Sequence, residues 1–294
     1  MVLLLDLAIL LAILFLFLGS IEDLKTGEIP EKISYGYIAS ALLVAGADAV
    51  LAGDSNLFLN SFLMGAAYFA VGFVLFYLGQ WGGGDVKLAA GIGCTLGYLA
   101  QAGYFHDILF PYYATYFINM ICVALPYATV YGLLLGAKSP ETRKEFDCYL
   151  RKKKTILVFV LSFAPSLAAL YMGLDNIALF YTVIPVMVLI ALYLKAVELK
   201  ALRETVDVSR LREGDVPAED LEAEGEILIK KTDIEGLSPE DVKKVQDLAK
   251  QGKLPEKIVI KRGIKFAPVL LLALLSALYV GNYVELIIIA MLST

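Results

Sequence analysis

Two acidic residues with distinctive neighbours stand out in a mostly apolar sequence. Asp23 opens the stretch D-L-K-T-G-E-I-P at residues 23–30, and Asp85 closes the stretch G-G-G-D at residues 82–85. Two carboxyl groups a few Å apart cannot both be ionised, so they share one proton. The ionised member can act as a general base on water, while the protonated member polarises a peptide carbonyl. The pair therefore predicts peptide hydrolysis that needs no metal, no cofactor and no covalent intermediate.

The glycines before Asp85 fit the same chemistry. Gly82, Gly83 and Gly84 have no Cβ, so the backbone of an extended substrate could lie against them, and the segment could move. The competing interpretation is an ordinary turn between two helices. These glycines are candidate substrate-binding residues on the first interpretation only.

Two glutamates flank the first aspartate. Glu22 and Glu28 could attract basic residues of a substrate, because carboxylates favour a cation in a partly desolvated site. They could equally be solvated charges at a membrane interface. Both interpretations stay open from the sequence.

The elements that must position these residues are membrane-spanning helices. Of 294 residues, 59% are hydrophobic and 19% charged, whereas a soluble domain carries about 25% charged residues; the mean hydropathy is +0.72. A helix needs roughly 17–25 apolar residues to cross about 30 Å of hydrocarbon. Runs of this kind lie at 2–20, 33–52, 57–79, 86–104, 109–136, 155–173, 176–198 and 264–292. They predict an all-α polytopic membrane protein, a bundle of about eight transmembrane helices in which Pro126 and Pro185 kink their helices without ending them.

One long polar segment divides the chain. We expect a transmembrane catalytic core of about seven spans at 1–198, a cytoplasmic insert at 199–263 and a C-terminal transmembrane helix at 264–294. Within the insert, Ser238 and Pro239 are typical of a helix start, and Gly252 marks its end. The apolar runs 227–229 and 258–260 could pair as strands. The insert is therefore predicted to be a small folded α+β unit.

Lysine and arginine placement predicts the orientation. All 25 of these residues lie in or beside the loops that follow spans one, three, five and seven. By the positive-inside rule those loops are cytoplasmic, with both termini outside, in a multi-pass protein of the plasma membrane. Asp23 and Asp85 then share the cytoplasmic face. The basic run at 138–154 is expected to anchor this side and to contact anionic lipid head groups, while the net charge of −5 excludes nucleic acid as the main partner.

The other polar residues do not suggest a catalytic role. The single histidine, His106, is expected on an outer loop, and the cysteines are too far apart in sequence to suggest a metal site or disulfides. Glu285 falls in the outer third of the last span, where a carboxylate is costly unless paired or near the interface. Gly93 and Gly97 form a G-x-x-x-G spacing that predicts close helix packing, which would help hold Asp85 near the first span.

The two acidic stretches carry a family resemblance. G-x-G-D followed by x-K-L resembles the second active-site motif of type IV prepilin peptidases and the related prearchaellin (preflagellin) peptidases, and D-x-x-T-x-x-I-P resembles the first. The resemblance implies an aspartyl endopeptidase that removes a short basic leader peptide from prepilin or prearchaellin precursors at the cytoplasmic membrane face. It implies that Asp23 and Asp85 are catalytic and that Gly82 and Gly84 are the motif glycines. Lys87 matches the motif lysine, to which we assign no role.

The motif-bearing resemblance covers residues 1–105, and residues 199–294 resemble the longer archaeal branch of the family. Bacterial members usually carry a cysteine-rich insert with paired C-x-x-C between the first spans and also methylate the new N-terminus. Here the loop after the first span is short and has no cysteine. An archaeal-type enzyme with peptidase activity alone is the better prediction.

Two other hypotheses were weighed. Presenilin-like and signal-peptide-peptidase-like intramembrane proteases also use G-x-G-D, but they pair it with Tyr-Asp on the preceding span and a later Pro-Ala-Leu, and neither occurs in suitable form. A proton-coupled transporter would use membrane carboxylates as a relay and often shows internal repeats. No clear repeat is visible, and both aspartates lie at span ends.

Overall fold

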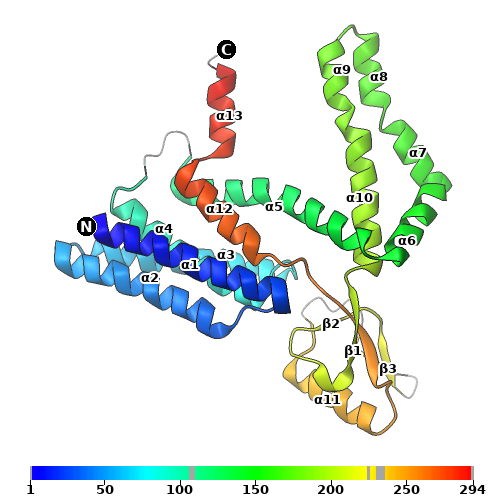
Figure 1. The fold of residues 1–294 in the computed structure, drawn as a ribbon, viewed down its shortest axis with the longest axis horizontal. Coiled ribbons are helices and arrows are strands. Elements are labelled where there is room, and N and C mark those ends of the chain that lie inside the picture. The colour runs from blue at the N-terminus through cyan, green and yellow to red at the C-terminus, as the bar shows by residue number, and fades with distance from the viewer. Residues whose placement is uncertain (1, 106–109, 224–225, 230–235, 293–294) are drawn as a thin grey trace. The chain divides into compact units, whose positions relative to one another are not determined.

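The computed structural model describes residues 2–105, 110–223, 226–229 and 236–292. The chain divides into two compact units, Met1–Pro126 with Lys265–Thr294, and Tyr127–Ile264 (Figure 1). The division falls within helix α5 (Tyr112–Ala137), which contains Pro126 as predicted. Among the described residues, six helices are long and apolar enough to cross a membrane, or seven if one bent pair is a single span. The protein is an all-α polytopic membrane protein with a small α+β insert.

The first unit is built on four helices that lie side by side (Figure 1): α1 (Val2–Thr26), α2 (Glu31–Ala52), α3 (Asn56–Tyr77) and α4 (Gly83–Gln101). Their connections are short, so successive helices run in opposite directions. The end of α1 and the start of α4 therefore meet at one end of the bundle. Helix α12 (Ala267–Tyr279) packs on α1 and α4 and brings a distant part of the chain to the same unit.

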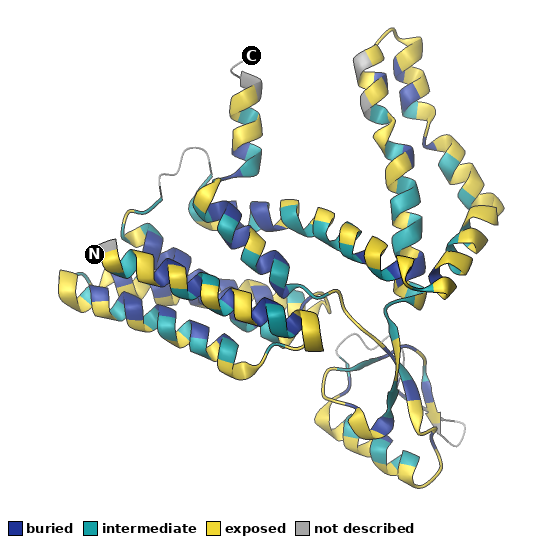
Figure 2. Cartoon of the chain, viewed as in Figure 1, coloured by how far each residue is buried: buried dark blue, intermediate teal, exposed yellow. Residues whose placement is uncertain are grey.

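Helix α4 explains why fewer spans are found than the eight predicted. It contacts α1, α2, α3 and α12 and is buried along nearly its whole length (Figure 2). A Cβ on Gly93 or Gly97 would lie 2.5 or 2.4 Å from the carbonyl oxygens of Met64 or Asn60 on α3. Small residues thus make α4 a packed central helix that is less apolar than a lipid-facing one. The predicted close packing is confirmed, but its partner is α3 and not the first span.

Two predicted spans contain a short interruption but remain single candidate spans, Lys153–Tyr171 and Ile177–Lys200. Residues 155–173 form α7 (Lys153–Leu161) and α8 (Ala164–Tyr171), with Pro165 in the first turn of α8. Residues 176–198 form α9 (Asp175–Tyr181) and α10 (Val183–Lys200), interrupted just before Pro185. A proline lacks the N–H of the helical hydrogen bond and crowds the preceding turn. Residues Ile177–Lys200 still form one candidate span with Pro185 inside it, as predicted, and the helix is interrupted only at Thr182.

The last span is bent. Helices α12 and α13 (Tyr283–Leu292) meet at 45°. Buried Asn282 stabilises the break, because its Oδ1 accepts the N–H groups of Val284 at 3.0 Å and Glu285 at 3.2 Å. Asn119 donates its side-chain N–H to the Gly281 carbonyl at 2.6 Å. The single run predicted at 264–292 did not include this break, where Asn119 and Asn282 satisfy backbone groups that a straight helix would have paired internally.

In the second unit, α10 packs against α6 (Pro140–Arg151) and α7. The insert that follows has a three-stranded antiparallel sheet of order β1-β5-β2 and a separate hairpin of β3 with β4. Its elements are β1 (Arg203–Asp207), the 3₁₀ helix Val208–Arg210, β2 (Val216–Pro217), β3 (Leu221–Ala223), β4 (Glu226–Ile229), α11 (Pro239–Lys250) and β5 (Lys257–Lys261). The predicted pairing of runs 227–229 and 258–260 is wrong. Each run is a strand, but β4 pairs with its chain neighbour β3 and β5 pairs with β1 and β2.

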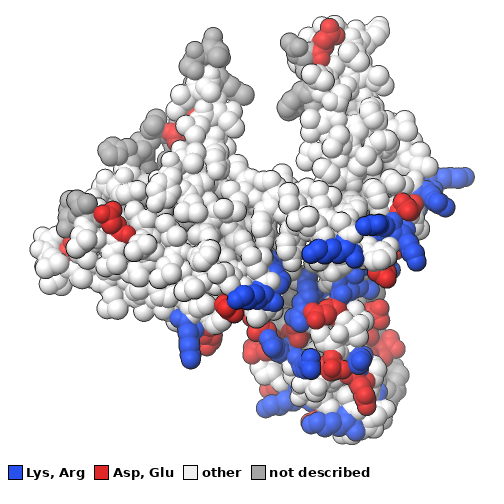
Figure 3. Space-filling model, viewed as in Figure 1, with Lys and Arg blue, Asp and Glu red and all other residues white. Residues whose placement is uncertain are grey.

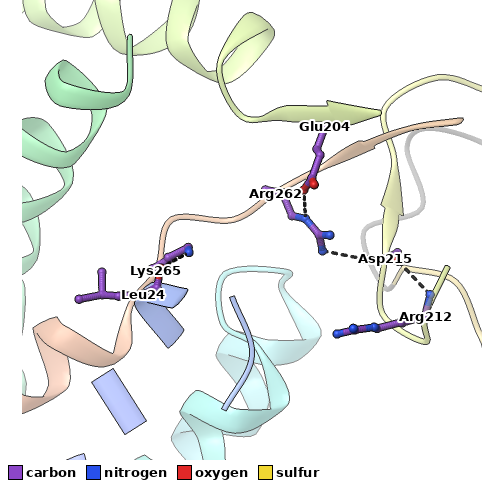
Figure 4. A network of polar contacts seen from close by, with 6 residues as sticks. All are labelled: Leu24, Glu204, Arg212, Asp215, Arg262 and Lys265. Carbon is purple, nitrogen blue, oxygen red and sulfur yellow. Dashed lines mark hydrogen bonds and ion pairs between the residues drawn. The ribbon is translucent and has the colours of Figure 1, made fainter. Parts of the chain in front are cut away.

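The insert has its own apolar core, with Val208, Leu237, Val245 and Ile260 almost fully buried. Charges of both signs cover its surface (Figure 3). Arg262 joins two parts of the insert, because its guanidinium bonds Glu204 at 2.7 Å and Asp215 at 3.1 Å (Figure 4). Helix α11 begins as predicted at Ser238, whose hydroxyl accepts the Asp241 N–H at 3.1 Å.

Candidate active site

Asp23 lies in the last two turns of α1, where only 6% of it is exposed. Its Oδ2 accepts the backbone N–H of Ala267 at 3.0 Å, the first residue of α12. The ammonium of Lys265 is within electrostatic range of the same carboxyl group. Lys265 also donates to the carbonyl of Leu24 (Figure 4). The start of α12 therefore presents a positive environment to Asp23, since helix N-termini carry unpaired N–H groups and partial positive charge.

Asp85 lies in the first turn of α4 and is 9% exposed. Its Oδ2 accepts the N–H of Gly82 at 3.0 Å, which fixes the carboxyl against the helix start. Its Oδ1 is buried and has no hydrogen-bond partner among the described residues. Both carboxyl groups are buried at the end of the bundle where α1 ends and α4 begins. The structure thus places the two residues that the sequence singled out at the same end of the first unit.

The two motifs contact each other through Gly84. A Cβ on Gly84 would lie 2.8 Å from the Cβ of Ile29, a distance that real Cβ atoms do not tolerate. Gly83 differs, because a Cβ there would have nothing within 4 Å. Thr26 orders the turn that delivers Ile29: its hydroxyl donates to the Glu22 carbonyl at 2.9 Å and accepts the Glu28 N–H at 3.2 Å. Ile29 can pack this closely only because residue 84 is glycine.

Trp81 connects the loop of the second motif to α12. Its ring is buried and lies 5.6 Å from the ring of Phe266, centroid to centroid. Phe266 directly precedes Ala267, which binds Asp23. Sequence reasoning missed Trp81, Lys265, Phe266 and Ala267 as site residues. The available signal was the stretch I-K-F-A-P at 264–268, where a proline follows directly on a candidate helix start.

The other predicted residues occupy outer positions. Glu22 is half-buried and Glu28 is exposed. The motif lysine Lys87 pairs with Glu31 at 2.8 Å and lies over the ring of Tyr35, so it ties α4 to the start of α2. Because Glu31 is largely exposed, this ion pair contributes at most about 1 kcal/mol.

The basic residues of the first unit are Lys25, Lys32, Lys87 and Lys265, and each lies near the helix ends that carry the two aspartates. Glu22, Glu28 and Glu31 lie at the same end, so the rim of the site carries charges of both signs. The same end of the bundle thus holds the paired carboxyl groups and the basic side chains around them.

Two buried carboxylates lie away from this site. Asp48 on α2 is 2% exposed and accepts the hydroxyl of Tyr98 at 2.8 Å, near the opposite ends of α2 and α4. Sequence reasoning missed Asp48, although it interrupts an apolar run. Glu285 is buried in the first turn of α13, and His106 lies outside the described residues. Within the described parts of the chain, no three His, Cys, Asp or Glu side chains gather as metal ligands.

The fold defines a polytopic membrane protein, and comparison with known proteins gives the class. Residues 10–137 match the type IV leader peptidase family. Over 94% of its length the chain is 24% identical to prepilin peptidase EppA of Methanothermobacter thermautotrophicus, and 94% of that relative is covered. No solved structure matches the chain. The resemblance inferred from the two motifs is confirmed, and both matches support a leader peptidase function.

Proposed function

We propose that this protein is a membrane aspartyl endopeptidase that removes the basic leader peptide of prepilin-like or prearchaellin precursors at the cytoplasmic face. The observation that carries the proposal is the burial of both Asp23 and Asp85 at the end of the bundle where α1 ends and α4 begins. The family match spans both motifs. The basic residues around this end agree with a cytoplasmic orientation.

The contacts of each carboxyl group assign the roles. Burial disfavours the charge on both carboxyl groups, and we assign Asp23 as the ionised general base because the Ala267 N–H, the α12 N-terminus and Lys265 oppose that effect at Asp23. Asp85 is the protonated general acid, because it is deeply buried beside that charge and has one bonded oxygen.

The reaction then proceeds in two stages. Asp23 takes a proton from water, the water oxygen attacks the peptide carbonyl carbon, and Asp85 gives its proton to the carbonyl oxygen. In the second stage Asp23 passes its proton to the leaving nitrogen as the C–N bond breaks. Asp85 takes back a proton from the tetrahedral intermediate, which restores both carboxyl groups to their starting states.

The rim of the site provides substrate recognition. Glu22 and Glu28 attract basic leader residues, and the exposed Gly82 and Gly83 form the surface for the extended substrate backbone. Gly84, which the sequence also suggested for this role, is covered by Ile29. The basic segment 138–154 binds anionic lipid head groups and holds the protein at the inner leaflet.

Cleavage of a leader-bearing precursor by membranes containing variant protein tests the proposal. We expect Asp23→Asn and Asp85→Asn each to lower the cleavage rate by about 10²–10⁴-fold, the range for loss of a general acid or base. Asp48→Asn is the matched control: it is also a buried aspartate of this unit and its hydrogen bond to Tyr98 survives the change. Wild-type cleavage by either Asp23→Asn or Asp85→Asn would rule the mechanism out.

A further inference from the structure

Helix α5 packs on α10 through two glycines one turn apart. A Cβ on Gly132 would lie 2.3 Å from Cδ2 of Leu194, and a Cβ on Gly136 would lie 2.6 Å from Cγ2 of Val197. Beside this contact the two helices border a groove with a volume of about 410 Å³. Its apolar lining comes from both helices: Ala128, Tyr131 and Gly132 of α5, and Ala191, Leu194 and Val197 of α10.

The groove lies on membrane-spanning helices. Both α5 and α10 belong to candidate spans, and Ala191 in the lining is exposed, so the groove opens to the surface that faces lipid. Along α10, the distance from Ala191 to the helix end at Lys200 is about 14 Å at about 1.5 Å per residue. This is about half of the roughly 30 Å of hydrocarbon in a bilayer. An acyl chain of one leaflet therefore matches the groove, and it supplies the contacts that an unfilled apolar groove would lack.

Lys195 gives this groove a positive charge. It lines the groove on α10, and its ammonium forms no ion pair within the described part of the chain. Glu198 also lines the groove but lies beyond ion-pair distance of Lys195. Lys200, nearer the end of α10, differs because it is paired with Glu145 at 3.5 Å. Since a charged side chain on a membrane span is costly unless it is paired or reaches the interface, Lys195 favours an anion at this end of the groove.

Lys152, between α6 and α7, brings a second cation to the same place. Its ammonium lies 4.3 Å from the ring centroid of Tyr149, and the ammonium of Lys195 lies 5.8 Å from the same centroid. Lys152 is exposed and likewise forms no ion pair with any described residue. A cation–π contact at an exposed site is weak, so both ammonium groups can still bind an anion. Other basic side chains gather around this end of the unit (Figure 3).

We propose that this groove binds one anionic phospholipid. Its phosphate lies between the ammonium groups of Lys195 and Lys152, and one of its acyl chains fills the groove between α5 and α10. Basic pockets between transmembrane helices recognise anionic head groups in this way. A zwitterionic head group fits less well, because its own cation meets the same two lysines. The inference adds a defined site to the lipid contact proposed for segment 138–154, and it depends on the membrane location of the chain and not on the peptidase reaction.

Native mass spectrometry of the full-length protein, titrated with phosphatidylglycerol or phosphatidylcholine, measures the affinity for the first bound lipid. We expect phosphatidylglycerol to bind at least about tenfold more tightly than phosphatidylcholine. Lys195→Gln and Lys152→Gln should each weaken its binding about fivefold, the effect of one basic residue beside anionic lipid. Lys200→Gln is the matched control. It removes the same charge from the same helix, but Glu145 already pairs with that charge, so binding should change less than about twofold.

Filling the groove tests where the acyl chain lies. Ala191→Trp should weaken binding of the first phosphatidylglycerol about tenfold, the loss of roughly two buried methylene groups. Val186→Trp is its control, because it places the same side chain at an exposed position of α10 outside the groove. Lys195→Gln changes an exposed side chain, so the proposal stays testable if the melting curve shows that Ala191→Trp does not fold.

Three results would overturn the proposal: equal affinity for the two lipids, equal losses in Lys195→Gln and Lys200→Gln, or wild-type lipid binding by a folded Ala191→Trp. The same spectra report the oligomeric state. A dimer that dissociates in Ala191→Trp while lipid binding stays intact would assign the groove to a second copy of the chain instead.

Discussion

At the scale of single residues, the contact between Gly84 and Ile29 joins the two halves of the site. The first motif supplies Ile29 at the end of its turn, and the second motif supplies the glycine that Ile29 covers. Each half of the site therefore depends on the other for its position. This contact gives a physical reason for two motif positions that carry no reactive group.

A pair of adjacent glycine substitutions tests this contact. Gly84→Ala places a methyl group 2.8 Å from Ile29 Cβ, so either Ile29 or the start of α4 must shift. We expect a loss of about 1–3 kcal/mol of stability, as for other overpacked sites, and a large loss of leader cleavage. Gly83→Ala meets nothing within 4 Å and should keep its melting temperature. If Gly83→Ala destabilises the protein as much as Gly84→Ala does, the packing explanation fails.

Residue types and spacing predicted the two aspartates as candidate catalytic residues, because each lies within a recognisable short sequence motif. They could not predict the groups that hold Asp23 in place. Ala267 binds Asp23 across 244 positions of sequence, and Phe266 meets Trp81 in a tilted ring contact that leaves no periodic signal. Contacts of this kind depend on how distant helices pack, which a local pattern does not encode.

At the scale of elements, helix α11 begins where side chains close to one another in the sequence cap its first turn. Ser238 and Asp241 exchange hydrogen bonds across the first turn. The side-chain and backbone hydrogen bonds from Ser238 hold the pKa of Asp241 below its ordinary value of 3.8. A carboxyl group with a lowered pKa in the folded state contributes stability above its ordinary pKa, and that contribution is lost as the pH falls through the lowered value.

Ser238→Ala tests this cap. We expect the change to cost about 0.5–2 kcal/mol of helix stability at pH 7, seen as faster hydrogen exchange over residues 239–250 of the full-length protein. The difference from wild type should shrink as the pH falls through the lowered pKa of Asp241, because protonated Asp241 contributes less to the cap. Ser209→Ala, at an exposed position of the insert, should leave the exchange unchanged. Equal exchange in Ser238→Ala and wild type at pH 7 would contradict the assignment.

Helix boundaries inside the apolar runs were less predictable. Hydropathy located the runs but not the interruptions at Pro165 and Pro185, nor the break that Asn282 stabilises. Hydropathy also counted α4 as one more lipid-facing span, whereas its small residues place it against α3. A window average cannot distinguish a helix surrounded by protein from one surrounded by lipid.

At the scale of the whole molecule, the positive-inside pattern predicts which connections face the cytoplasm. Single cysteines in a background without Cys94, Cys122 and Cys148 test it. A membrane-impermeant maleimide should label Ser55→Cys, between α2 and α3, in intact cells. It should label Ser238→Cys in the insert only after permeabilisation. Labelling in the reverse order would place both aspartates on the outer side and contradict cleavage at the cytoplasmic face.

Composition was sufficient to predict a polytopic helical protein. A long apolar run in a membrane must pair its backbone N–H and C=O groups internally, and a helix does so. It did not indicate that residues 265–294 pack with the first four helices and place the start of α12 against Asp23. The active-site end of the molecule is assembled from three separated parts of the chain. Sequence motifs predicted only the two parts that carry the aspartates.

A double-mutant cycle on leader cleavage tests most directly whether Asp23 and Asp85 act as one unit. Groups that act together show strongly non-additive losses, because removing the second costs little once the first is gone. We predict that Asp23→Asn combined with Asp85→Asn cleaves the precursor at a rate within a few-fold of either single variant. Losses that multiply in the double variant would show instead that the two carboxyl groups contribute independently, and the shared activation of water would be refuted.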